Sequence, residues 1–298
     1  PCRTLFIAYD PHVKIPYLKT AISVVTPQGE ESEIACDQID IGVGGPDLKR
    51  VPFLILPHLV PDLPVYLLWT ETLHPGYHAL FESLCKLATR VIFDSESEEN
   101  LPVFARALLN LRKTTGIDIA DLNWARTEEW RDLTASLFDN PARLEDLKKI
   151  SSIQLIYNAQ ETEFFSHLQV QSLYFISWLA ARLNWKWEKT DKNFHFYFNH
   201  LKIEIGSEYW KQLGPGTLIG TTFATFDQHV YSAKRLPREY YHVRVDISTP
   251  EKCELPCQFV LAKTAAGHSL VKEICTKGTS AHYLETLEKL ITLNQPRL

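Results

Sequence analysis

Short apolar runs alternate with amphipathic stretches in the first half of this chain, and this alternation is the sequence feature that most constrains its fold. Runs rich in Val, Ile, Leu and aromatic residues are typical of strands, and the stretches between them have helical spacing. The expected strands are Thr4–Tyr9, Ile22–Thr26, Val65–Trp69 and Arg90–Phe93, and the expected helices are Pro46–Val60, Tyr77–Ala88 and Glu98–Lys113. Such alternation favours a mostly parallel sheet covered by helices. We therefore predict a Rossmann-like α/β domain over residues 1–140.

The second half is richer in strands. The expected strands are Ile153–Tyr157, Phe194–Phe198, Leu201–Ile205, Thr217–Thr225, His242–Ile247 and Gln258–Lys263, with helices at Gln169–Leu183 and Ser280–Leu293. Asn199 and His200 are typical of a two-residue hairpin. Runs of strands with helices at each end indicate an α+β domain with a largely antiparallel sheet over residues 151–298. The polar stretch at residues 140–151 is the expected domain boundary.

The segment DLNWARTEEWRDLTASLFD, residues 121–139, gathers aromatic and basic side chains around an expected helix start. Thr127 is a candidate N-cap, and two glutamates then place negative charge beside the positive end of the helix dipole. A helix is therefore expected from Glu128. Its apolar stripe, with Trp130 and Leu133 among its members, is expected to be buried, either in the chain's own core or against a partner.

Trp124, Arg126, Trp130 and Arg131 are the candidate partner-binding residues of this segment. Tryptophan and arginine often carry the binding energy of protein interfaces, because each combines a large contact area with directional donors. The segment is thus the expected contact surface of the chain.

Two places could hold a ligand. The run Gly42–Asp47 precedes an expected helix, where backbone amides can bind a phosphate, but it lacks both the G-x-G-x-x-G spacing and the Lys-Ser/Thr of a P-loop. A flexible turn is the alternative. Asp94 and Ser95 follow an expected strand, where open α/β sheets bind ligands, although an N-cap is the alternative there.

Catalytic motifs are absent from the sequence. It contains no G-x-S-x-G, H-E-x-x-H or kinase set, and no pair of carboxylates is spaced for acid/base work. His58 lies in an apolar, proline-rich corner and is expected to be structural. These observations favour a protein that is not an enzyme and that needs no cofactor.

Charge and composition exclude two classes of partner. The net charge is -5 and the pI is near 6.1, so the chain lacks the basic character that binding to nucleic acid requires. The most apolar window, Val51–Trp69, contains four prolines and Asp62, which a continuous membrane helix would not tolerate. We expect neither nucleic acid nor a membrane as a partner.

Six cysteines are scattered along the chain, too few for a disulfide scaffold, and a cytoplasmic location fits them best. Cys253 and Cys257 stand close together in the loop CELPC. Two unpaired thiols, a redox pair and half of a metal site with His242 and His268 are the alternatives.

Three blocks of sequence resemble one known family. The segments DLNWAR (121–126) and WRDL (130–133) are similar to the signature region of the OpcA family, the glucose-6-phosphate dehydrogenase assembly proteins. The segments LVPDLPVYLLW (59–69) and RVIFDS (90–95) resemble the family's proline-rich helix-to-strand corner and its next strand. The segment WLAARLNW (178–185) is similar to a helix in its C-terminal half. Pro1, Cys2 and Arg3 resemble the family's entry to a strand, which a further segment usually precedes, so we expect an N-terminal segment to be missing here.

The resemblance implies a function without catalysis. A family member would bind glucose-6-phosphate dehydrogenase in the oxidative pentose phosphate pathway and favour its active oligomer, as an allosteric activator. Two alternatives stay open: a sugar-phosphate or nucleotide-binding α/β enzyme that uses Gly42–Asp47 with Asp94 and Ser95, and a scaffold for some other enzyme.

Overall fold

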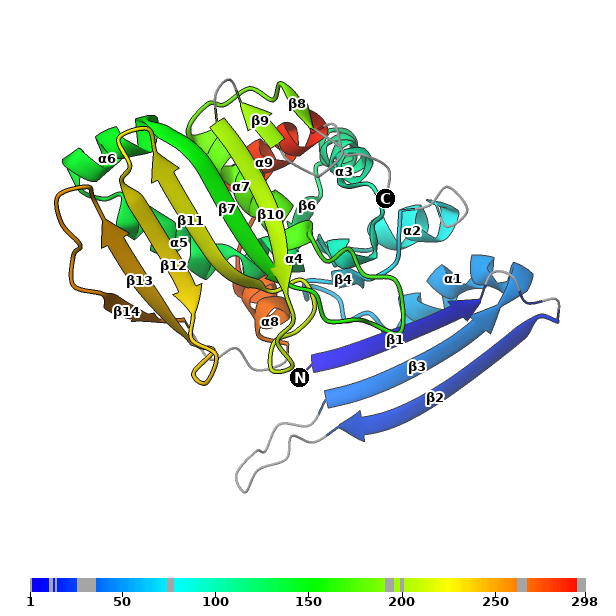
Figure 1. Ribbon diagram of the computed structural model, residues 1–298. Coiled ribbons are helices and arrows are strands. Elements are labelled where there is room, and N and C mark those ends of the chain that lie inside the picture. The colour runs from blue at the N-terminus through cyan, green and yellow to red at the C-terminus, as the bar shows by residue number, and fades with distance from the viewer. Residues whose placement is uncertain are drawn as a thin grey trace. The chain divides into compact units, whose positions relative to one another are not determined.

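The computed structural model describes residues 2–10, 13, 15–25, 36–73, 78–190, 196–198, 201–261 and 267–293 (Figure 1). The chain divides into two compact units, of which unit 1 contains Pro1–Leu67 with His74–Thr89 and unit 2 contains Leu68–Leu73 with Arg90–Leu298. Contacts define these units, whereas the expected boundary at residues 140–151 rests on composition and stays a prediction. Within the described ranges, no helix has the length and apolar character needed to cross a membrane.

Unit 1 is built on a three-stranded mixed sheet with the order β1-β3-β2. Its strands are β1 (Cys2–Asp10), β2 (Tyr17–Val25) and β3 (Cys36–Gly44). β3 runs parallel to β1 and antiparallel to β2. Ile39, Ile41 and Val43 of β3 are buried, and the residues between them are more exposed, as expected for a strand with one face in a core. β3 was not among the expected strands.

Prolines break the helix that we expected over Pro46–Val60. The structure has three short pieces there: η1 (Gly45–Arg50), α1 (Val51–Ile55) and η2 (Leu56–His58). Each piece carries a proline in its first two positions. Proline has no N–H and disrupts a helix interior, but it is tolerated in a first turn, so each proline begins a new piece. The expectation of one helix was therefore wrong. The next helix of this unit is α2 (His78–Cys85).

Unit 2 begins with a small sheet of order β4-β5-β6. Its strands are β4 (Tyr66–Trp69), of which Leu68 and Trp69 belong to this unit, β5 (Arg90–Phe93) and β6 (Asp118–Asp121). β5 and β6 run parallel. Helix α3 (Leu101–Thr115) connects β5 to β6. Asn100 caps its start by accepting the N–H of Val103 at 3.0 Å, and Gly116, with φ of 73°, ends it. The predicted strand–helix alternation is confirmed here.

The rest of unit 2 is an eight-stranded sheet of order β14-β13-β12-β11-β7-β10-β9-β8. Its strands are β7 (Ile150–Asn158), β8 (Lys189–Thr190), β9 (Phe196–Phe198), β10 (Leu201–Glu208), β11 (Leu218–Thr225), β12 (Val230–Arg235), β13 (His242–Ser248) and β14 (Cys257–Val260). Among the described strands of this sheet, β7 and β10 pair parallel and the other neighbours pair antiparallel. The predicted largely antiparallel sheet is confirmed.

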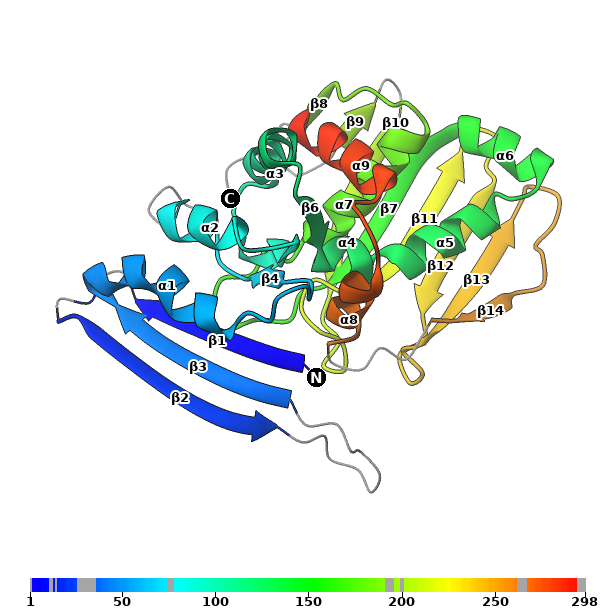
Figure 2. The ribbon, with the colours of Figure 1, turned by 180° about the vertical axis from the view of Figure 1, so that it is seen from behind.

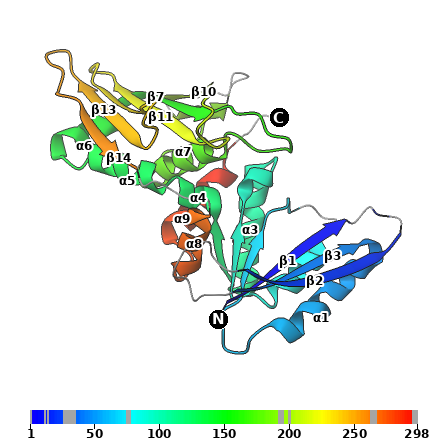
Figure 3. The ribbon, with the colours of Figure 1, turned by 90° about the horizontal axis from the view of Figure 1, so that it is seen from below.

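Helices cover one face of this sheet, as Figures 2 and 3 show for α5, α6 and α7. They are α5 (Glu128–Leu137), α6 (Pro141–Lys148) and α7 (Val170–Arg182). The final helix, α9 (Ala281–Ile291), packs against α7 and α3. Every residue of α7 from Val170 to Ser177 is buried, which fits its nearly continuous apolar sequence.

Several elements of unit 2 were not expected from the sequence, namely β6, α4 (Leu122–Arg126), α6, β8, β12 and α8 (His268–Cys275). Each is short, so that periodicity carries little signal. The predicted hairpin corner at Asn199 and His200 lies outside the described residues, although the flanking strands β9 and β10 pair antiparallel.

Candidate functional site

The chain turns from β6 directly into α4, and Asp121 fixes this turn. Its Oδ1 accepts the backbone N–H groups of Asn123 at 2.7 Å and of Trp124 at 3.2 Å, which satisfies two of the unpaired amides that begin every helix. The same oxygen accepts the hydroxyl of Ser95 at 3.0 Å. Asp121 thus joins the ends of β5 and β6.

Thr127 has a different role from the one predicted. Helix α5 does begin at Glu128, as expected, but Thr127 has helical backbone angles and caps nothing. Its hydroxyl donates to the carbonyl of Trp124 at 2.9 Å. The cap prediction was wrong because α4 immediately precedes α5, and a threonine in helical conformation bonds back to the preceding turn.

Polar side chains from the carboxyl ends of β5 and β6 form one group, which we call the edge cluster. Its members are Asp94, Ser95, Glu96, Asp121, Asn123 and Arg126. The amide of Asn123 donates to Asp94 at 3.0 Å, and Arg126 donates to Glu96 at 2.5 Å and to Asn123 at 2.9 Å. Asp94 also caps η4 (Ser95–Ser97), as the N-cap alternative predicted. Hydrogen bonds therefore connect the members of the edge cluster to one another.

Burial dominates the electrostatics of the edge cluster. Asp121 is fully buried, and burial, with the nearby carboxylate of Asp94 as a smaller cause, raises its pKa to about 7 against its hydrogen bonds. Burial also raises the pKa of Glu96, while Arg126 acts in the opposite direction. Two carboxyl groups of this cluster thus hold protons more tightly than they would in water.

Arg131 lies in the interior at the junction of α4 and α5. Its Nη1 donates to the carbonyl of Trp124 at 2.7 Å and to the hydroxyl of Thr127 at 2.5 Å. The guanidinium stacks on the ring of Trp124, with 3.4 Å between Cζ and the ring centroid. Burial lowers the pKa of Arg131 to about 9, because desolvation disfavours its charge.

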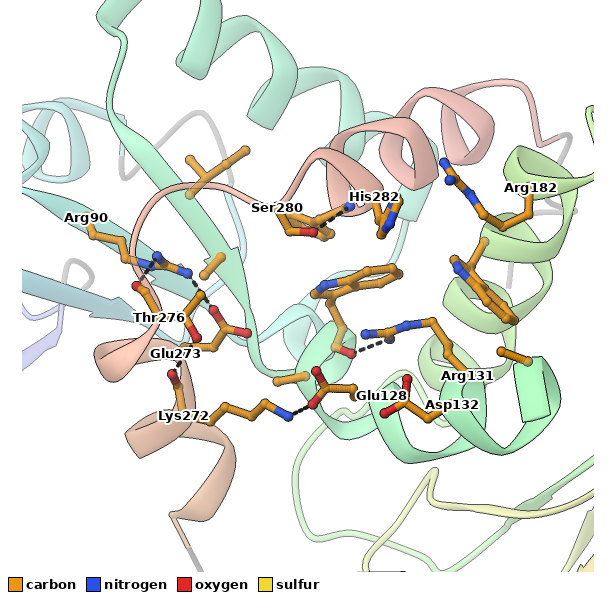
Figure 4. Close-up of a pocket in the computed structure, with 17 residues that line it drawn as sticks. Arg90, Glu128, Arg131, Asp132, Arg182, Lys272, Glu273, Thr276, Ser280 and His282 are labelled. Atoms are coloured by element: carbon orange, nitrogen blue, oxygen red, sulfur yellow. Dashed lines mark hydrogen bonds and ion pairs between the residues drawn. The ribbon is translucent and has the colours of Figure 1, made fainter. Parts of the chain in front are cut away.

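A cavity of about 390 Å³ opens beside Arg131 in unit 2 (Figure 4). Figure 4 shows Arg90, Glu273 and Lys272 on one side of it and Arg131 with Arg182 on the other. Arg90 donates to Glu273 at 2.5 Å and also to the carbonyls of Thr276 and Gly278. Trp124, Trp178 and Tyr283 add aromatic surface to the lining. Charged and aromatic groups therefore face one small space.

The structure places the four candidate partner-binding residues at different depths. Trp130 is 1% exposed, Trp124 6% and Arg131 8%, so all three belong to the interior of unit 2. The side chain of Arg126 is 31% exposed. The predicted contact surface stays a prediction, and exposure favours Arg126 among the four. Of the two alternatives for the apolar stripe of α5, the chain's own core or a partner, the core is where Trp130 and Leu133 lie.

The glycine run has a structural explanation. Gly42 and Gly44 lie in β3, so the expectation of a flexible turn was wrong for them. A Cβ on Gly44 would come within 2.5 Å of the side chains of Tyr17 and Val13, which shows that close packing requires glycine there. Only at Gly45, with φ of 64°, does the chain turn into η1.

Cys253 and Cys257 are exposed free thiols, and the redox-pair hypothesis remains a prediction. Across the described part of the chain, no group of three or more His, Cys, Asp or Glu side chains could hold a metal ion. His58 lies in η2 and is partly buried, and its carbonyl accepts the guanidinium of Arg3 at 3.0 Å.

Sequence reasoning missed most of the cavity lining. Arg90 comes from β5, Lys272 and Glu273 come from α8, and His282 comes from α9, so these residues stand far apart in the sequence. The only available signal was the charged face of α8, and that helix was itself not predicted. Residues that meet through packing leave no spacing pattern to recognise.

The described architecture defines the fold class of this protein. In this class an α/β part is followed by a largely antiparallel sheet with helices on one face. This architecture is similar to the fold of KijD10, a 3-ketoreductase from Actinomadura kijaniata, with a TM-score of 0.53 and 12% identity over 85% of this chain and 80% of that one. Likeness at this identity describes the fold alone.

Sequence comparison then gives the family. A model described as the glucose-6-phosphate dehydrogenase subunit N-terminal domain matches residues 1–112, and its C-terminal counterpart matches residues 117–251. The OpcA proteins of Nostoc punctiforme and Synechocystis sp. are 31% and 30% identical over 190 and 191 residues, which is 62% of this chain in both cases. The chain spans 38% of the length of these relatives. It belongs to the OpcA family of glucose-6-phosphate dehydrogenase subunits.

Proposed function

We propose that this chain is an assembly factor that binds glucose-6-phosphate dehydrogenase and favours its active oligomer, as part of the oxidative pentose phosphate route. The observation that carries the proposal is the match of two consecutive models of dehydrogenase-subunit domains, over residues 1–112 and 117–251. No active site is needed for this function. A factor that binds one assembly state more tightly than another shifts the population by its difference in affinity.

Arg126 is the residue that we propose for contact with the dehydrogenase. Its guanidinium is partly exposed, and bonds to Glu96 and Asn123 hold it in one orientation. A fixed arginine loses little conformational freedom on binding and presents several donors. Trp124, Trp130 and Arg131 would support this position from the interior.

The test is the specific activity of the dehydrogenase from the same organism, titrated with this chain and followed in parallel on a sizing column. We expect activation and co-elution. Arg126→Ala should weaken both, whereas Arg238→Ala, which removes an exposed arginine of the β12–β13 connection, should leave them unchanged. No activation and no complex would contradict the proposed function, and equal losses in both variants would contradict the contact surface alone.

The second candidate is a nucleotide or sugar-phosphate enzyme, which the buried carboxyl of Asp121 at the carboxyl end of β6 favours. Its ligand would stabilise the folded chain by about 2.7 kcal/mol at a concentration 100 times the dissociation constant. A thermal-shift screen with NADP, NAD and glucose 6-phosphate distinguishes the candidates, because the assembly factor alone predicts no shift.

A further inference from the structure

The cations that line the cavity differ in how their charges are balanced. Arg90 pairs with Glu273, Lys272 pairs with Glu128, and Arg182 pairs with Glu285. Arg131 forms no ion pair with any described residue, although it is 8% exposed. Asp132 and Glu273 favour its charge from beyond ion-pair distance, so no carboxylate bonds directly to this buried guanidinium.

Only part of the hydrogen-bonding capacity of Arg131 is used. Nη1 donates to the carbonyl of Trp124 and to the hydroxyl of Thr127, and stacking on Trp124 fixes the plane of the group. Among the described residues, Nε and Nη2 have no acceptor. These two nitrogens form the edge of the guanidinium that suits two parallel bonds to an oxyanion.

We propose that the cavity beside Arg131 binds a small carboxylic acid, with the carboxylate held by Nε and Nη2 of Arg131. A carboxylate would give the guanidinium the direct bonds that Asp132 and Glu273 do not make. A phosphate dianion suits the site less well, because Glu128, Asp132 and Glu273 also line the cavity and would repel the second charge.

The walls indicate the nature of the rest of the ligand. Trp124, Trp178 and Tyr283 offer aromatic surface, and the volume of about 390 Å³ lies within the range of small-molecule sites. Ala135 and His282 are exposed members of the lining and stand where a ligand would enter. The ligand is therefore a compact acid with an apolar body.

This binding site is independent of the proposed function, since it needs no dehydrogenase. It can be tested on the chain alone, and its failure would leave the assembly activity untouched. Two tryptophans of the lining, Trp124 and Trp178, provide a signal, because their fluorescence changes when the surrounding groups change.

The experiment is a fluorescence titration at constant ionic strength. Benzoate and succinate are the carboxylate probes, and inorganic phosphate is the probe for the alternative anion. We expect saturation with at least one carboxylate below roughly 10 mM, with phosphate giving none. Saturation by phosphate alone would overturn the carboxylate assignment, and the absence of saturation with all three probes would overturn the site.

Two neighbouring substitutions on α5 provide a matched pair. Ala135→Phe should fill the entrance and weaken binding at least roughly tenfold, whereas Ser136→Phe, exposed on the same helix and outside the lining, should not. Arg131→Lys keeps the charge and loses the two-donor edge, so it should also weaken binding roughly tenfold. Should the lysine variant fail to fold, the phenylalanine pair decides: equal affinities in the pair would overturn the proposal.

Discussion

Arg126 and Arg131 belong to consecutive helices, α4 and α5, yet their surroundings are opposite. Arg126 lies in the edge cluster, where Asp94 and Glu96 balance its charge and solvent reaches 31% of its side chain. Arg131 lies beside the cavity, almost fully buried, and bonds to one backbone carbonyl and one hydroxyl, with a tryptophan face beside it and no direct bond to a carboxylate. One short stretch of sequence therefore supplies both an arginine in direct ion pairs and a buried arginine without one.

The largest expected loss of stability follows from a substitution in the edge cluster. Asp121→Ala removes the cap of α4 and leaves the hydroxyl of Ser95 without this acceptor, so the free energy of unfolding should fall by about 3 kcal/mol. Urea denaturation followed by circular dichroism measures this loss. Asn100→Ala, which removes the exposed cap of α3, is the control and should cost about 1 kcal/mol. Similar losses in the two variants would show that the edge cluster adds nothing beyond a cap.

The next effect is the pH dependence of the stability that Asp121 contributes in the same cluster. Because burial raises the pKa of Asp121 from 3.8 to about 7, the folded chain binds more protons than the unfolded chain between these values. Asp121 therefore contributes its full stability below pH about 4, and this contribution falls as the pH rises through about 7. Asp121→Asn cannot ionise, so its stability relative to the parent chain should improve by on the order of 2 kcal/mol from pH 4 to pH 7. A constant difference across this range would contradict the raised pKa.

A smaller effect is expected when Arg126 is changed. Arg126→Ala leaves Asp94 and Glu96 without their cation in a partly exposed place, and the free energy of unfolding should fall by about 1 kcal/mol. Chemical denaturation at two salt concentrations measures it, and the loss should shrink at high salt. A loss above about 3 kcal/mol would mean that Arg126 is part of the core rather than of a contact surface.

The smallest effect is expected at Arg131. Arg131→Met replaces a buried cation that has no direct ion pair by an apolar chain of similar length, so the free energy of unfolding of the ligand-free chain should change by less than about 1 kcal/mol. The freed carbonyl of Trp124 limits the gain. If this variant loses more than Arg126→Ala does, Arg131 is chiefly a structural link between α4 and α5, and the contrast between the two arginines fails.

The hydrophobic pattern of the sequence predicted the main helices and strands. Arg90–Phe93 is β5 as expected, and the helices expected at Gln169–Leu183 and Ser280–Leu293 are α7 and α9 within two residues at each end. Long, strongly periodic stretches carry their own evidence, because the same residues that form the helix also bury its apolar face. The prediction of one helix over residues 46–60 failed because each of its prolines is compatible with a helix start, whereas three in succession break one helix into pieces.

The sequence by itself determined the α/β and antiparallel-sheet classes, the family, and the concentration of arginine and tryptophan in residues 121–139. Tertiary structure alone decided that Trp124 and Trp130 are interior, that Asp121 joins two strand ends, and that Arg131 faces a cavity with groups from α8 and α9. The physical reason is that helix and strand patterns depend on near neighbours, whereas burial and charge balance depend on which distant elements pack together.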